Sequence, residues 1–117
     1  MRSPLPLLLT ITLAGCATSP DEAGFADVVG QVFHASGAPV VAPTVSVSCS
    51  GRALVMTTGD SLGHYQVALE SVAGRHHCTF VANGAGPVPI QRDTTIGFAP
   101  PGLHPLQYVD LRETITP

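Results

Sequence analysis

The chain has 117 residues, of which 44% are hydrophobic and only 11% charged, and its formal net charge at pH 7 is −3. This length allows a single folded domain, and so apolar a composition argues against a disordered chain. The sequence contains no lysine and its five arginines are scattered, so there is no basic stripe of the kind that binds nucleic acid.

The first sixteen residues have the layout of a secretory signal. An arginine at position 2 is followed by an apolar run from Leu5 to Leu13, and small residues come next. The run is about nine residues long, which is too short to span a bilayer of ~30 Å as a helix. The segment therefore predicts export rather than a membrane-spanning helix.

The end of this segment, Leu13-Ala14-Gly15-Cys16, resembles the lipobox of bacterial lipoproteins. The resemblance implies that residues 1–15 are a removable signal peptide and that Cys16 is acylated on its sulfur and its amine, which anchors the chain in a membrane. The competing interpretation is an ordinary secretory signal. Because Ala17 rather than aspartate follows the cysteine, the resemblance implies the outer membrane if the host has two membranes.

Residues 16–27 are expected to comprise the lipidated cysteine and a flexible tether, because they show no hydrophobic periodicity. Fully extended, the eleven residues after Cys16 reach roughly 40 Å at most. The domain is therefore expected to stay close to the membrane surface.

From Val28 onward, short β-rich runs alternate with clusters of glycine, proline, aspartate and serine at intervals of about ten residues. No window sustains a helical apolar stripe, so the pattern predicts an all-β sandwich or barrel. The expected strands are 28–34, 44–50, 52–58, 64–69, 76–82, 88–98 and 106–112, followed by a tail at 113–117.

Alternation along three of these strands predicts which side chains face the core. The expected inward positions are Val45, Val47 and Cys49 on the second strand, Tyr65, Val67 and Leu69 on the fourth, and His76, Cys78, Phe80 and Ala82 on the fifth.

Two motifs resemble the signatures of carboxypeptidase regulatory-like domains. The first is Val28-x-Gly30-x-Val32 with the segments 36–40 and 44–47, and the second is the segment 58–67, which contains an aspartate-centred turn and Gly-x-Tyr. The resemblance covers residues 28–112. It implies a seven-stranded, antiparallel-rich Greek-key β-sandwich of transthyretin-like (prealbumin-like) fold, in a family whose domains are generally not catalytic.

One position departs from the family pattern. Ala42-Pro43 stands where a Gly-Ala pair is usual. This departure predicts either a stiffer start of the strand 44–50 or a shift in its register.

With Cys16 lipidated, Cys49 and Cys78 remain as an even pair in an oxidising compartment. In a transthyretin-like arrangement their strands are neighbours in one sheet, which implies a disulfide between them. Closing a loop of roughly 30 residues should contribute about 3.5 kcal/mol. The alternative is two separate buried thiols.

Five histidines, at positions 34, 64, 76, 77 and 104, raise the question of a metal site or of catalysis. Neighbouring strand residues point to opposite faces, so His76 and His77 cannot share an ion. The transthyretin-like fold includes 5-hydroxyisourate hydrolases, but this chain lacks their C-terminal Tyr-Arg-Gly-Ser, and it has no Gly-x-Ser-x-Gly elbow. We therefore predict no metal, no cofactor and no enzymatic activity.

The proline-rich segment 98–105 is the candidate binding loop, with Phe98, Leu103 and His104 as its contact residues. The alternative is a stiff crossover whose apolar side chains lie in the core. The sequence as a whole predicts a lipid-anchored cell-envelope protein, held to the membrane through Cys16, with a non-catalytic binding or structural module for an envelope protein, peptide or glycan. The competing function is a small-ligand or metal-handling protein, or a transthyretin-like hydrolase, that uses surface histidines and arginines.

Overall fold

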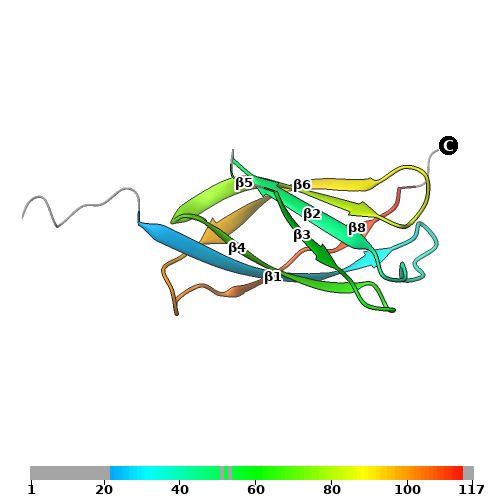
Figure 1. Cartoon of the computed structure of the whole chain (residues 1–117), viewed down its shortest axis with the longest axis horizontal. Coiled ribbons are helices and arrows are strands. Elements are labelled where there is room, and N and C mark those ends of the chain that lie inside the picture. The colour runs from blue at the N-terminus through cyan, green and yellow to red at the C-terminus, as the bar shows by residue number, and fades with distance from the viewer. Residues whose placement is uncertain (1–21, 51, 53, 115–117) are drawn as a thin grey trace, which may run out of the picture.

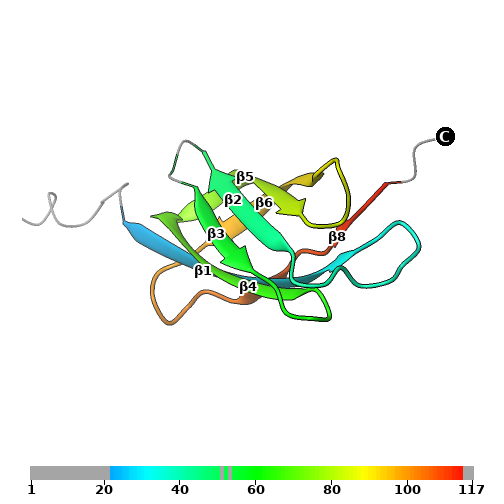
Figure 2. The ribbon, with the colours of Figure 1, turned by 45° about the vertical axis from the view of Figure 1, so that its right-hand side comes forward.

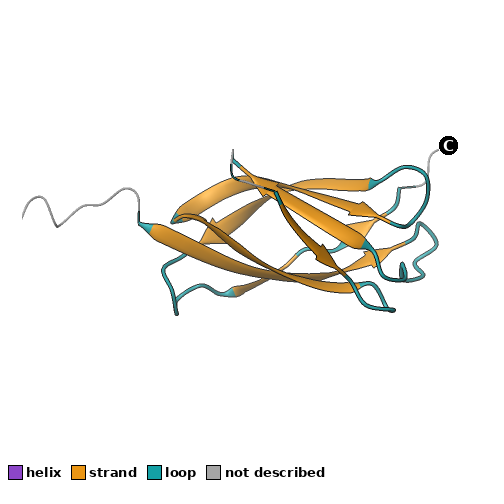
Figure 3. Ribbon diagram, viewed as in Figure 1, coloured by secondary structure: helices purple, strands orange, loops and turns teal. Residues whose placement is uncertain are grey.

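The computed structural model describes residues 22–50, 52 and 54–114, and this part of the chain is all-β, with strands joined by loops and no helix (Figure 3). No described segment forms a helix long and apolar enough to cross a membrane. The strands within these residues are β1 (Ala23–Phe33), β2 (Thr44–Cys49), β3 (Val55–Thr58), β4 (His64–Val72), β5 (Gly74–Asn83), β6 (Ile90–Phe98), β7 (Leu106–Tyr108) and β8 (Leu111–Arg112).

The strands form two sheets that lie face to face as two layers (Figures 1 and 2). One sheet has the order β4-β1-β7, with β8 also pairing with β1, and the other has the order β3-β2-β5-β6. The neighbours pair antiparallel except for β7 and β8, which both run parallel to β1.

The core lies between the sheets and is built from the inward positions of alternating strands. On β2 and β4 burial alternates residue by residue, as the sequence predicts. The largest fully buried side chains include Phe80, Ile96 and Leu111. Because the side chains alternate between the two faces, the core between the sheets is apolar. Within the described residues, no charged residue is buried, and Ser71 is the buried polar residue.

The first strand begins earlier than the sequence predicts. Residues 23–27, expected as part of the tether, belong to β1, where Ala23 pairs with Val72 and Asp27 with Ala68. Small residues give this stretch little hydrophobic signal, but pairing with the end of β4 satisfies its backbone. The segment between Cys16 and the domain therefore has six residues.

The last predicted strand, 106–112, is divided into β7 and β8, so the described chain has eight strands rather than seven. The interruption falls at Val109 and Asp110. The carbonyl of Val109 accepts a hydrogen bond from the Tyr65 hydroxyl, and the carboxylate of Asp110 accepts one from the Gln31 N–H at 2.9 Å. The Val109 N–H still donates to the Val29 carbonyl at 2.9 Å, and beyond it these side-chain contacts interrupt the ladder.

The edge of β6 is capped by a side chain from the other sheet. The Gln107 amide donates to the carbonyl of Gly97 at 2.8 Å and accepts from its N–H at 3.0 Å. At Gly97 a single primary amide thus occupies both backbone groups that would otherwise be open to a further strand.

At Ala42 the backbone adopts a left-handed conformation, with φ of 48°. An L-residue with a Cβ is strained in this conformation by about 1–2 kcal/mol. The register of β2 is nevertheless regular, since Thr44 pairs with Thr58 on one side and with Asn83 on the other.

We expect Ala42→Gly to raise the free energy of unfolding by roughly 0.5–1 kcal/mol, because relief of strain exceeds the entropy that glycine adds to the unfolded chain. Thermal unfolding followed by circular dichroism measures the change. The matched control is Ala38→Gly, at an exposed residue outside the positive-φ region, which should be destabilising. Equal effects of the two substitutions would contradict strain at Ala42.

Candidate functional site

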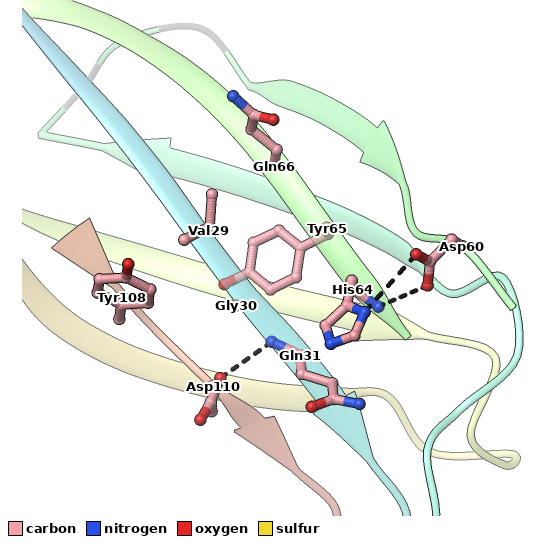
Figure 4. A pocket seen from close by; sticks show the side chains of 9 residues that line it. All are labelled: Val29, Gly30, Gln31, Asp60, His64, Tyr65, Gln66, Tyr108 and Asp110. Atoms are coloured by element: carbon pink, nitrogen blue, oxygen red, sulfur yellow. Dashed lines mark hydrogen bonds and ion pairs between the residues drawn. The ribbon is translucent and has the colours of Figure 1, made fainter. Parts of the chain in front are cut away.

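A hollow of about 540 Å³ lies in the β4-β1-β7 sheet. Gly30 and Tyr65 lie at its centre, with Tyr108 and Asp60 toward opposite ends in the view of Figure 4. The residues that line it are Val29, Gly30, Gln31, Asp60, His64, Tyr65, Gln66, Tyr108 and Asp110.

The centre of the hollow follows from the pairing of Gly30 with Tyr65 across β1 and β4. A Cβ at Gly30 would lie only 1.8 Å from the Val109 carbonyl oxygen and 2.9 Å from the Tyr65 ring, so no side chain fits. Tyr65 is buried, and its hydroxyl donates to that same carbonyl. Burial raises the pKa of Tyr65 well above its ordinary value, with a further increase from Asp110, so the hydroxyl remains a donor.

One end of the hollow is an aspartate-centred turn. A single carboxylate oxygen of Asp60, Oδ1, accepts the N–H groups of Leu62 and His64, each at 2.9 Å. The other oxygen lies 3.6 Å from Nδ1 of His64. These interactions stabilise the ionised carboxylate: the His64 N–H, then the Leu62 N–H, lower the pKa of Asp60 below its ordinary value of 3.8.

The lowered pKa of Asp60 predicts that part of the free energy of unfolding is lost when this carboxylate is protonated in acid. Since the folded pKa is depressed, the contribution is complete above the unfolded pKa and is lost as the pH falls through the folded value. We expect Asp60→Asn to remove this loss, because the amide oxygen can accept the same hydrogen bonds without binding a proton. Melting temperatures measured between about pH 5 and pH 2 should fall less steeply for the variant than for the wild type. Parallel curves would contradict the role of this carboxylate.

The opposite end of the hollow presents an exposed aromatic ring. Tyr108 is 74% exposed and lies beside Val29 on the outer face of the sheet. The exposed side chain of Gln66 adds a primary amide to the rim. The hollow thus combines an aromatic surface with amide groups and with the carboxylates of Asp60 and Asp110, a set suited to a polar ligand without negative charge.

The histidines do not gather at this site. Only His64 lines the hollow, while His77 is exposed on β5 in the other sheet. Three histidines face three separate carboxylates: His34 with Glu113 at 3.8 Å, His64 with Asp60 at 3.6 Å, and His104 with Asp27 at 3.1 Å. Among the described residues, no three histidine, cysteine or acidic side chains are grouped so that they could hold a metal ion.

The candidate binding loop is only partly as predicted. Phe98 is 4% exposed and its ring packs against His76, with the ring centroids 5.4 Å apart, so the expectation that it is a contact residue is wrong. It occupies an inward position at the end of β6, and alternation along that strand places it in the core. Leu103 is 74% exposed. His104 is turned toward Asp27 and is partly buried.

The two core cysteines are joined. Cys49 and Cys78 pair directly across β2 and β5, with a Cα–Cα distance of 4.1 Å, and their sulfurs form a disulfide. Both residues are buried. The disulfide lies within one sheet, because β2 and β5 are neighbouring strands, as expected from the sequence. The alternative of two separate buried thiols is wrong. Cys16, the predicted lipidation site, lies outside the described residues.

Sequence reasoning located the turn with Asp60 and the motif residues Gly30 and Tyr65, but it missed the hollow. Tyr108, Gln66 and Asp110 were not singled out. The available signal was alternation: Gln31 and Gln66 are polar outward positions on strands whose inward positions are apolar. Compared with known proteins, the chain matches no protein-family profile and no curated protein.

Proposed function

We propose that this protein is a lipid-anchored component of the cell envelope whose β-sandwich is a non-catalytic binding module. The observation that carries the proposal is the Cys49–Cys78 disulfide. Such bonds persist in oxidising compartments outside the cytoplasm. The sequence has three cysteines, and the one that this bond does not include is Cys16, in its lipobox-like context.

The finer fold assignment belongs to the same proposal. A carboxypeptidase regulatory-like domain of transthyretin-like fold is supported by the way its two signature motifs meet. Gly30 of the first motif pairs directly with Tyr65 of the second. The absence of a side chain at Gly30 leaves room for the Val109 carbonyl, and the Tyr65 hydroxyl donates a hydrogen bond to that carbonyl. The glycine of the first motif and the tyrosine of the second therefore position the same backbone group.

Anchoring is tested by expressing the full chain in a bacterium and following membrane fractionation and incorporation of a labelled fatty acid. The wild type should label and sediment with membranes, and Cys16→Ala should lose both properties. The matched control is the double variant Cys49→Ala/Cys78→Ala, which keeps Cys16 and should still label. Fatty-acid labelling of Cys16→Ala at the wild-type level would refute the anchor.

For the module itself, the hollow favours a neutral saccharide among the expected partners. An exposed tyrosine ring can pack against the apolar face of a sugar. The amides around it can donate hydrogen bonds to hydroxyl groups and accept them, and the carboxylates can accept them. The carboxylates of Asp60 and Asp110 disfavour an anionic ligand. The separation of the histidines supports binding rather than catalysis.

A panel of neutral oligosaccharides, titrated against the purified protein and followed by NMR, tests this site. We expect resonances around the hollow to shift, Tyr108→Ala to lose the response, and Tyr108→Phe to retain most of it. Val88→Ala, at another exposed apolar residue away from the hollow, serves as the control. If no saccharide shifts these resonances, the glycan assignment is wrong and a peptide or protein partner takes its place.

A further inference from the structure

The loop formed by residues 99–105 lies beside the point where the chain enters the domain. Phe25, near the start of β1, donates its N–H to the carbonyl of Ala99 at 2.8 Å, and Ala99 donates back to Phe25 at 3.1 Å. The two segments therefore occupy the same end of the sandwich, where the orange loop lies close to the blue start of β1 in Figure 1. An attachment of the chain before β1 would therefore also keep this loop close to the point of attachment.

The loop is fixed in shape and presents an apolar tip. Leu103 donates its N–H to the Pro100 carbonyl at 3.0 Å, closing a tight turn in which Gly102 has φ of 83°. Behind the turn, Nε2 of His104 lies 3.1 Å from the Asp27 carboxylate. Leu103 itself is 74% exposed, so its side chain is displayed by a preformed turn rather than packed.

The chain around this tip carries no formal charge. Between Asp93 and Asp110 the sequence has no aspartate, glutamate, lysine or arginine. Leu106, at the start of β7, is a second exposed apolar residue close by, at 49%. The carboxylate that contacts the loop is that of Asp27, which faces His104 behind the turn and not the leucine at its tip. An apolar tip without an ionisable side chain of its own can enter an apolar phase without the cost of burying an ion.

The connection between Cys16 and the domain is short, and the inference drawn from its length rests on the proposed lipidation of Cys16. Six residues separate Cys16 from Ala23, so the Cα atoms of these two residues can be at most roughly 25 Å apart. We propose that the loop 99–105 docks into the lipid leaflet that holds the Cys16 anchor, with Leu103 inserted at the boundary between headgroups and acyl chains. The domain would then be attached at two points and have one orientation.

The other end of the sandwich supplies a matched comparison. Leu62 is also an exposed leucine in a tight turn, at 54%. Its turn contacts the far end of β1, where the Val32 N–H donates to the Gly63 carbonyl at 3.0 Å. In the proposed orientation Leu62 faces away from the membrane.

The test exploits the absence of tryptophan from the sequence. The full lipidated chain, carrying either Leu103→Trp or Leu62→Trp, is reconstituted into phosphatidylglycerol–phosphatidylethanolamine vesicles that contain a spin-labelled lipid quencher. We expect a blue-shifted emission and several-fold stronger quenching for Leu103→Trp than for Leu62→Trp. Flotation of the same samples reports whether the lipid anchor is present, and circular dichroism reports whether each variant is folded.

The outcomes separate the two proposals. Folded protein that floats with the vesicles but gives equal quenching at both positions retains the anchor and overturns the docking of the loop. Folded protein that does not float overturns the anchor. If Leu103→Trp does not fold, the fallback variant is Leu103→Asp in the chain without tryptophan, and Leu62→Asp is its control. The measurement is the protection of the vesicle-bound domain from proteolysis. Selective loss of protection in Leu103→Asp supports docking, and equal protection overturns it.

Discussion

Replacing Gly30 by alanine is expected to lower the free energy of unfolding by about 3 kcal/mol or more, or to prevent folding altogether. The added Cβ would lie 1.8 Å from the Val109 carbonyl oxygen and 2.7 Å from its carbon. Both are backbone atoms, so no side-chain rotation can relieve the clash. The chain after β7 would have to move, which would also break the hydrogen bond from Tyr65 to the same carbonyl.

The measurement is chemical or thermal unfolding followed by far-ultraviolet circular dichroism. Gly97→Ala is the matched control, because a Cβ there meets only the Gln107 side chain at 3.9 Å, an ordinary contact. That variant should change the stability by less than about 1 kcal/mol. If Gly30→Ala unfolds at the same denaturant concentration as Gly97→Ala, the packing of Val109 against β1 is wrong.

Loss of the disulfide is the second large effect that we expect. The bond joins residues 29 apart in sequence, and opening such a loop should lower the free energy of unfolding by about 3.5 kcal/mol. In a domain of about 90 residues this corresponds to a fall in melting temperature well above 10 °C. The link connects two strands within one sheet, so its loss should weaken the β2–β5 pairing in particular.

Two routes to the broken bond separate the cross-link from the side chains. Wild type reduced while unfolded and then refolded with reductant lacks the bond but keeps both sulfurs, whereas Cys49→Ala/Cys78→Ala lacks both. Each should melt well below the oxidised wild type, and reductant should have no further effect on the double variant. An unchanged melting temperature of the fully reduced wild type would contradict the stabilising role of the bond.

The sequence was a good guide where a strand has one face in the core. Alternating burial on β2 and β4 reproduces the predicted inward residues, and the same rule brought Cys49 and Cys78 to one sheet face. Such positions are predictable because the pattern that specifies them is local and because burial of apolar side chains dominates their energetics.

The errors occur where distant contacts decide the structure. Residues 23–27 lack a hydrophobic period and become a strand by pairing with the end of β4, more than forty residues away in sequence. The division between β7 and β8 depends on the contacts of Tyr65 with Val109 and of Gln31 with Asp110. No local pattern in 106–112 contains that information.

The same reasoning explains the candidate sites. Leu103 was named from its proline-rich surroundings and is exposed, while Phe98 was named with it and is buried. Tyr108 was overlooked because an exposed tyrosine in a short strand has no sequence signature. The hollow exists only because Gly30, Tyr65 and Val109 meet, and these residues come from three separate strands and loops.

The Gln107 amide, which occupies both backbone groups of Gly97, affects how copies of this protein can associate through their sheet edges. An open sheet border is where strand-by-strand polymerisation can start. At Gly97 that border is already occupied from within the same molecule. A neighbouring copy would have to displace both hydrogen bonds before it could pair with β6 at Gly97, so addition of a strand at this residue is disfavoured.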